Sequence, residues 1–301
     1  MQVGRVAAAV AVIAAVVSGC GGPAQAGSAV IVGNDVVPLE AVQSQLNTAL
    51  GRTDQIQQLN QQGVTTADLA RRIVTREVIH DLLTRRAAAD GIVVTDAQVD
   101  AYLDSNGGAD AVLADSVYDL PTLRERVRDN LIAAELGRQL APGLAVTIDI
   151  VAATSREEAE QTARTLQAGG PDADALFRDP SVSARNELYQ AVSSPNEAAT
   201  VVFGVPEGTV GYFQPNPGQS QWIVFRVNDR STTTPSDPAA VSSISQSQLA
   251  AIGERALQPD GEALGIRVNP RYGEWDPIQA LVVAEGQVAG GILVPAAASA
   301  G

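Results

Sequence analysis

Three consecutive amphipathic helices, predicted between Thr65 and Leu140, place the strongest constraint on how this chain can fold. Thr65 and Asp68 have the spacing of a capping box, in which a hydroxyl and a carboxylate satisfy free backbone donors at a helix start. The helix behind them carries apolar residues around most of its circumference, which indicates contacts on several sides. A second helix is expected from Thr95, and a third begins near Pro121, because proline suits a first helical turn. None of these helices can bury its apolar face alone.

The apolar stripes on these helices have two interpretations. The first is ordinary helix-to-helix core, which is what most such stripes form. The second is that part of the surface stays open and binds extended peptides. For that alternative, the candidate peptide contacts are Tyr102, Leu123, Val127 and Trp275.

Charge and composition argue against several functional classes. The formal charge of -14 repels phosphate backbones, so nucleic acid is not an expected partner. The chain has one cysteine and one histidine, which excludes an internal disulfide and a Cys/His zinc cluster. No nucleotide-binding or serine-hydrolase motif occurs, and no metal or cofactor is expected. His80, the single histidine, lies within the first predicted helix and is interpreted as a packed or half-exposed structural residue.

The beginning of the chain resembles the export signal of a bacterial lipoprotein. Arg5 supplies a positive start, and the apolar run from Val6 to Val17 is shorter than the about 20 residues needed to span a bilayer. Val17, Ser18 and Gly19 precede Cys20 as the aliphatic and small residues of the lipobox precede its lipid-bearing cysteine. The sequence therefore predicts removal of residues 1–19 and acyl chains, such as palmitate, on Cys20.

A flexible tether is expected over residues 20–29, because the segment is rich in small residues. Attraction to anionic lipid cannot anchor a chain with this negative charge, so the acyl chains must do so, and two or more chains give stable anchoring. The expected location is the outer face of the cytoplasmic membrane.

The rest of the chain is predicted to alternate short strands and helices. Leu144 to Ile150 has the period of a strand, and a helix is expected from Ser155. Val201 to Phe203 is interpreted as a short strand and Trp222 to Val227 as a buried one. The final predicted elements are a linker at 231–238, a helix over 239–257, a strand at 266–269 and a loose tail over 277–301.

The order of these elements resembles that of SurA-like exported chaperones. The resemblance covers roughly Val30 to Leu140, and it rests on the strand and turn over 30–37, the link over 85–96 and the helix over 123–128. In that family a returning C-terminal helix and strand complete the N-terminal domain. The resemblance therefore implies that 266–269 pairs near 30–32. It also implies a parvulin-type prolyl isomerase domain inserted between the two parts.

Residues 143–231 resemble a reduced parvulin domain through the turn at Pro206–Val210 and the strand at Trp222–Arg230. Active parvulins place histidines in their first and last strands, and these positions fall at Asp149 and Ile223 here. Prolyl isomerisation must lower a barrier of about 18–20 kcal/mol, and neither histidine is present to support the pocket that this needs. The unit is therefore interpreted as a scaffold or peptide-contact module, although residual isomerase activity stays open as an alternative.

Together these observations predict an α+β fold, in which a mostly helical N-terminal domain is completed by a C-terminal helix and strand. The expected function is a membrane-anchored chaperone, or holdase, for unfolded or newly exported polypeptides. The alternatives are a residual prolyl isomerase and an adaptor for one cell-envelope partner. The predicted segments are a signal peptide (1–19), a tether (20–29), a SurA-like helical domain (30–142), a degenerate parvulin-like domain (143–231), the returning helix and strand (232–276) and the tail (277–301).

Overall fold

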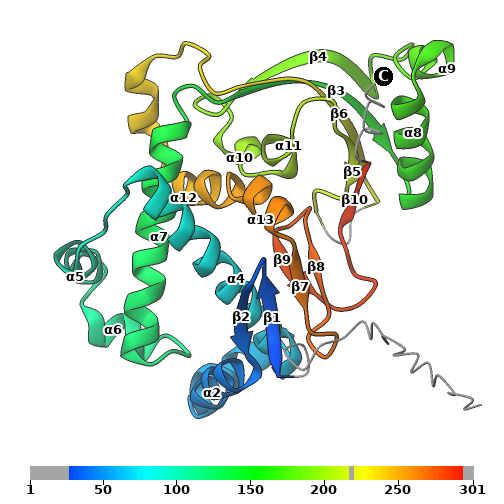
Figure 1. Ribbon diagram of the computed structural model, residues 1–301. Helices are drawn as coiled ribbons and strands as arrows, with labels where there is room; N and C mark the ends of the chain where they lie inside the picture. The colour runs from blue at the N-terminus through cyan, green and yellow to red at the C-terminus, as the bar shows by residue number, and fades with distance from the viewer. Residues whose placement is uncertain (1–26, 217–219, 294–301) are drawn as a thin grey trace, which may run out of the picture.

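The computed structural model describes residues 27–216 and 220–293, which form an α+β structure (Figure 1). The first part of the chain is a hairpin followed by helices; the sequence predicted the first strand, the turn and the helices, but not the second strand. Its elements are β1 (Ser28–Val32), β2 (Asp35–Pro38), α2 (Leu39–Leu50), α3 (Thr53–Gln61), α4 (Thr66–Asp90), α5 (Asp96–Ser105), α6 (Ala109–Ala114) and α7 (Leu120–Leu140).

The predicted helix starts are confirmed by their caps. Thr65 and Asp68 form the capping box of α4, and Thr95 and Gln98 form that of α5. The carboxylate of Asp119 accepts a hydrogen bond from the backbone N–H of Thr122 and begins α7. Local sequence thus fixes where each helix begins. The glutamine-rich residues 53–61 form a regular helix, α3.

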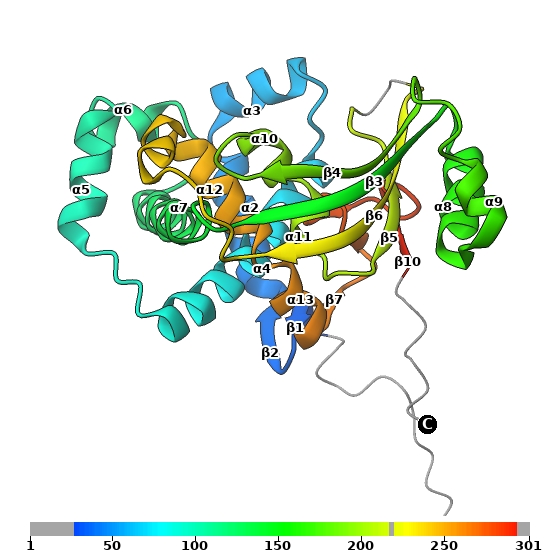
Figure 2. The ribbon, with the colours of Figure 1, turned by 90° about the horizontal axis from the view of Figure 1, so that it is seen from above.

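A five-stranded antiparallel sheet forms the second part of the structure, in the strand order β10-β5-β6-β3-β4. Its central strands β3 and β6 have apolar residues on both faces, because helices cover the sheet on both sides (Figure 2). The elements of this part are β3 (Ala145–Ala153), α8 (Arg156–Ala168), α9 (Gly170–Ala175), β4 (Ser183–Gln190), α10 (Pro195–Ala198), α11 (Val201–Gly204), β5 (Val210–Phe213) and β6 (Trp222–Ser231).

The last part of the chain returns to the first, as the family resemblance implied. Strand β7 pairs antiparallel with β1, and Val268 lies opposite Val30. Helix α12 packs against α7 and crosses it (Figure 1). The elements are η1 (Pro238–Ser243), α12 (Gln246–Arg255), α13 (Gln258–Leu264), β7 (Ile266–Val268), β8 (Glu274–Asp276), β9 (Leu281–Val283) and β10 (Gly290–Leu293).

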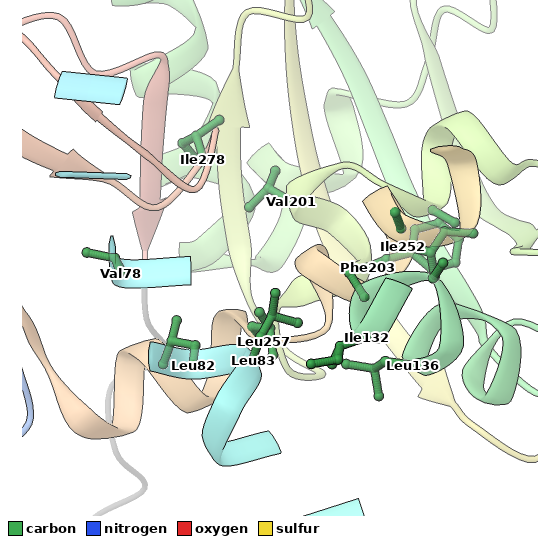
Figure 3. Close-up of a cluster of buried hydrophobic side chains, with 14 of the residues drawn as sticks. Val78, Leu82, Leu83, Ile132, Leu136, Val201, Phe203, Ile252, Leu257 and Ile278 are labelled. Atoms are coloured by element: carbon green, nitrogen blue, oxygen red, sulfur yellow. The ribbon is translucent and has the colours of Figure 1, made fainter. Parts of the chain in front are cut away.

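One hydrophobic core joins all three parts of the chain. It contains Val78 and Leu83 of α4, Leu136 of α7, Phe203 of α11 and Ile278 beyond β8, which converge in Figure 3. Because the helical block shares this core with one face of the sheet, the two parts are expected to unfold together.

Two sequence-based predictions are wrong. The run from Val201 to Phe203 is not a strand but a single helical turn, α11, which is buried between α12 and the sheet. A short apolar run has no period by which a strand can be distinguished from a buried helical turn. Residues 277–293 are not a loose tail: β9 pairs with β8, and β10 adds an edge strand to the large sheet beside β5. Residues 294–301 lie outside the described part of the chain.

Candidate functional site

Three adjoining hollows follow helix α4 and together form a groove, which we call the α4 groove. The first, of about 350 Å³, lies between α3, α4 and the loop before α7. The second, of about 670 Å³, lies between α4, α7, α12 and β9, and the third, of about 200 Å³, between α4, α13 and β7. The first two hollows share Arg72, Arg76, Tyr118 and Arg126, and the last two share Ile79 and Glu254.

The walls of the first hollow are held by side chains that bond to backbone carbonyls. The Nε2 of Gln55 on α3 donates to the carbonyl of Ala114 at 2.6 Å. The Nη2 of Arg52 donates to the carbonyl of Tyr118 at 2.9 Å. These two bonds tie the loop before α7 to α3, so the hollow has a defined width.

Several charges along the groove are already paired. Arg71 contacts the carboxylate of Asp68 at 2.7 Å, and the buried Arg76 contacts that of Glu125 at 2.6 Å. Arg76 also donates to Gln45 and Glu77, yet its Nε–H has no hydrogen-bond partner among the described residues. Such a donor is unusual, because buried polar groups are nearly always bonded.

Two arginines of the groove form no ion pair with a described residue. Within the described residues, no carboxylate lies at ion-pair distance from Arg72 or Arg126. Arg126 donates to the hydroxyl of Tyr118 at 2.6 Å, and its guanidinium lies 4.8 Å from the centre of the Tyr118 ring. Both arginines line the first and second hollows, so an unbalanced positive charge sits where these hollows meet.

Glu254 also lines the second hollow. Burial raises the pKa of this carboxyl group and is the largest effect. The charge of Arg126 lowers the pKa and the charge of Asp129 raises it, both to a smaller extent. The groove is therefore positive at its centre and acidic toward the third hollow.

His80 is the half-exposed structural residue that the sequence predicted, with its side chain 37% exposed. Its Nδ1 lies 2.9 and 3.1 Å from the two carboxylate oxygens of Asp129, and this hydrogen bond is the main cause that raises the pKa of His80. Ligand atoms of His80, Glu125 and Asp129 lie within 4.8 Å of one another. The carboxylate of Glu125 is already paired with the guanidinium of Arg76. The contacts of His80 with Asp129 and of Arg76 with Glu125 therefore form a hydrogen-bonded link between α4 and α7.

The four candidate peptide contacts do not lie together. Leu123 and Val127 are buried in a small core between α5, α6 and α7, and Tyr102 packs against that core. Trp275 on β8 lines the third hollow of the groove. A peptide contact at Leu123 or Val127 would require this small core to open. Most residues that line the groove carry no sequence signal of their own, but the closely spaced arginines at 71, 72 and 76 are visible in the sequence.

The two positions aligned with parvulin histidines lie in the centre of the large sheet. Asp149 on β3 is 1% exposed and accepts hydrogen bonds from Arg226 at 2.5 Å, from the Nδ2 of Asn228 at 2.7 Å and from the backbone N–H of Asn186 at 3.0 Å. Ile223 on β6 pairs with β3 and β5. Asp149 is thus fully occupied in joining three strands.

Comparison with known families identifies the first part of the chain. Residues 2–135 match the family described as the SurA-like N-terminal domain. This segment is a SurA-like N-terminal domain. Its match runs into α7, and the large sheet lies beyond it, so the parvulin-like interpretation of residues 143–231 stays a prediction. Comparison with curated proteins gave no significant match.

The SurA-like domain suggests a chaperone-type role and is consistent with binding of unfolded polypeptides. Val17, Ser18, Gly19 and Cys20, on which the lipid anchor was predicted, lie outside the described residues. Across 27–216 and 220–293, no helix has the length and apolar character that would let it span a membrane.

Proposed function

We propose that this protein is a lipid-anchored chaperone of the cell envelope that holds unfolded or newly exported polypeptides in the α4 groove. The observation that supports this most is the position of the groove, which follows the central helix of the SurA-like domain from Leu69 to Leu82. At 1.5 Å per helical residue, that stretch is about 20 Å long and matches about six residues of extended chain.

A holdase assay tests this proposal. A soluble form that lacks residues 1–20 is mixed at equimolar ratio with an aggregating unfolded client, and light scattering is followed. The proposal predicts delayed and reduced scattering compared with the client alone. Scattering equal to that of the client with an inert protein of the same size would contradict it.

The adaptor alternative is favoured by one observation, the charged lining of the groove. Promiscuous binding surfaces generally use flexible apolar side chains that can repack. Photocrosslinking in cells from a probe at Gln58, which lines the first hollow, separates the two alternatives. Many exported polypeptides among the products would support the chaperone, and one stable partner would support the adaptor.

The membrane anchor is a separate part of the proposal and has its own test. The full-length chain is expected to fractionate with membranes and to incorporate labelled palmitate. The variant Cys20→Ser is expected to lose both properties, because two acyl chains supply the anchoring free energy. A Cys20→Ser protein that stays labelled and membrane-bound would rule out this attachment site.

We further propose that the protein does not catalyse prolyl isomerisation. The reason is that Asp149 and Ile223 occupy the positions of the parvulin histidines, and Asp149 is already bonded to Arg226, Asn228 and Asn186. A protease-coupled assay with Xaa-Pro peptides is expected to give the uncatalysed rate. A rate above that background, in proportion to protein concentration, would refute this part.

A further inference from the structure

The unbalanced positive charge at the centre of the α4 groove indicates what kind of polypeptide segment the groove selects. Arg71 and Arg76 already have carboxylate partners, and the neighbouring Arg72 and Arg126 have none among the described residues. The chain as a whole carries a formal charge of -14, because acidic residues outnumber basic ones. Two arginines without acidic partners in one hollow of an acidic protein are suited to an anion supplied by a ligand.

The geometry of the site also favours an anion. Tyr118 lies against Arg126, at 2.6 Å from its hydroxyl to the guanidinium, which orients that side chain in the groove. A carboxylate can accept bonds from several guanidinium N–H groups, because it offers about four lone-pair sites.

A peptide carboxylate can come from the C-terminus of a chain or from an internal Asp or Glu side chain, and the position of these arginines decides between the two. They lie where the first and second hollows meet, and the groove continues on both sides. A chain terminus would leave one of those sides empty, whereas an internal residue allows the polypeptide to extend along both.

We propose that the α4 groove binds an extended polypeptide segment through an internal Asp or Glu side chain, held by Arg72 and Arg126 beside Tyr118. This inference rests on the proposed function and names the substrate class for it. Glu254 and Asp129 line the second hollow and disfavour a second carboxylate on the side of that hollow. The site is therefore specific for an isolated acidic residue with uncharged or basic neighbours on that side.

Peptide binding to the soluble chain, measured by fluorescence anisotropy, tests the proposal. The probes are labelled peptides of about nine residues with blocked ends, one with a central glutamate and one with glutamine in its place. The glutamate peptide is expected to bind about tenfold more tightly at low salt, as for a charge-assisted hydrogen-bonded pair. The preference should shrink in 0.5 M salt because partly exposed charges are screened. Equal affinity for the two peptides would overturn the proposal.

A third probe distinguishes the source of the carboxylate. The glutamine peptide with a free C-terminal carboxylate is expected to bind no more tightly than its blocked form. If the free terminus instead restores tight binding, the groove recognises chain ends and the internal-residue proposal is wrong.

Substitutions assign the preference to these arginines. Arg72→Gln is expected to reduce the glutamate preference to below about threefold, and Arg126→Gln to do the same. Arg178→Gln is the matched control, because Arg178 is exposed after α9 and has no ion pair among the described residues. If Arg72→Gln retains the full preference while its circular dichroism matches the parent, the assignment fails.

The holdase assay keeps the two proposals distinguishable. Suppressed aggregation without any glutamate preference would leave the chaperone role intact and refute the carboxylate site. Failure to suppress aggregation, together with a retained glutamate preference, would refute the holdase role and leave a selective peptide-binding site.

Discussion

Gly137 of α7 and Gly253 of α12 face each other with no side chain between the two helices. A Cβ on Gly137 would overlap the carbonyl oxygen of Leu249, and a Cβ on Gly253 would overlap that of Ala133. This reciprocal contact sets how closely the C-terminal helix approaches the SurA-like domain. It brings together residues that are more than a hundred positions apart in the sequence.

Replacing either glycine with alanine is therefore expected to destabilise the protein. In an isolated helix the same change would stabilise by about 0.5–1 kcal/mol. Here the added methyl group must push two backbones apart, so Gly137→Ala and Gly253→Ala should each lower the free energy of unfolding by about 1–3 kcal/mol. Urea unfolding measures this change in the free energy of unfolding. Gln139→Ala, at an exposed position on α7, is the control and should change stability by less than about 0.5 kcal/mol. A stabilised Gly137→Ala protein would mean that the helices are not in close contact.

Arg255 is the second link between distant parts of the chain. This buried side chain donates to the carbonyl of Ala199 before α11 at 3.0 Å and to that of Ile278 beyond β8 at 3.0 Å. Burial lowers the pKa of Arg255 to about 10, with partial compensation by the charge of Asp276. Arg255 thus joins α12, the sheet unit and the C-terminal segment.

Arg255→Met is expected to cost about 2–4 kcal/mol, because it keeps most of the side-chain volume but leaves at least two carbonyls without donors. Arg255→Lys should recover little of this, since one ammonium cannot reproduce the planar set of donors. Limited proteolysis reports the local effect, with faster cleavage expected between residues 277 and 289. Cleavage unchanged from the parent, at equal global stability, would contradict the role assigned to Arg255.

Asp149 is expected to be essential for stability and irrelevant to catalysis. Asp149→Ala leaves three donors without their acceptor, and loss of a partner in a buried ion pair costs about 3–5 kcal/mol. We expect a cost at the lower end of this range, because the side chain of the partner Arg226 is 31% exposed and water can hydrate its charge once Asp149 is removed. Asp149→Asn keeps one acceptor oxygen and should cost less than Asp149→Ala. Asp172→Asn, at an exposed position on α9, is the control. If Asp149→Ala is as stable as the parent protein, the structural role assigned to Asp149 is refuted.

His80 should make stability depend on pH. Its pKa is raised above the usual 6.5 by the hydrogen bond with Asp129, and by the charges of Asp129, Glu125 and Glu77 against the opposing effect of burial. The stabilisation is thus fully present below the unfolded-state pKa and is lost as pH rises through the raised folded-state value. Because the side chain is 37% exposed, the contribution is expected to be at most about 1 kcal/mol.

Urea unfolding between about pH 6 and 8.5 tests this effect against His80→Gln, which cannot titrate in that range. The stability advantage of the parent over His80→Gln should be largest at the acidic end and decline with rising pH. An advantage that grows with pH would show that the pKa of His80 is lowered in the folded protein.

The part of the fold that was predictable from sequence is the part that local signals determine. Thr65 and Thr95 cap their helices with their own neighbours, so the start of α4 and of α5 could be read from four residues. The pairing of β7 with β1 depends on contacts across the whole chain, and only the family resemblance pointed to it.

The missed features are those that tertiary contacts determine. Strands β8, β9 and β10 are only three or four residues long, so no period was visible in them. The α4 groove is likewise not encoded in one segment. Arg72 and Arg126 come from different helices, and which arginines lack a partner becomes apparent only once the others have been paired.

The central claim is that the α4 groove itself holds unfolded polypeptide, and two neighbouring glutamines on α3 allow a matched test. Gln58 lines the first hollow, whereas Gln57 is exposed and does not line it. Gln58→Trp therefore adds bulk to the groove, and Gln57→Trp adds the same bulk outside it. In the equimolar aggregation assay, Gln57→Trp is expected to suppress client scattering as the parent does, and Gln58→Trp to lose at least about half of that suppression at unchanged stability. Equal suppression by the two variants would contradict the claim.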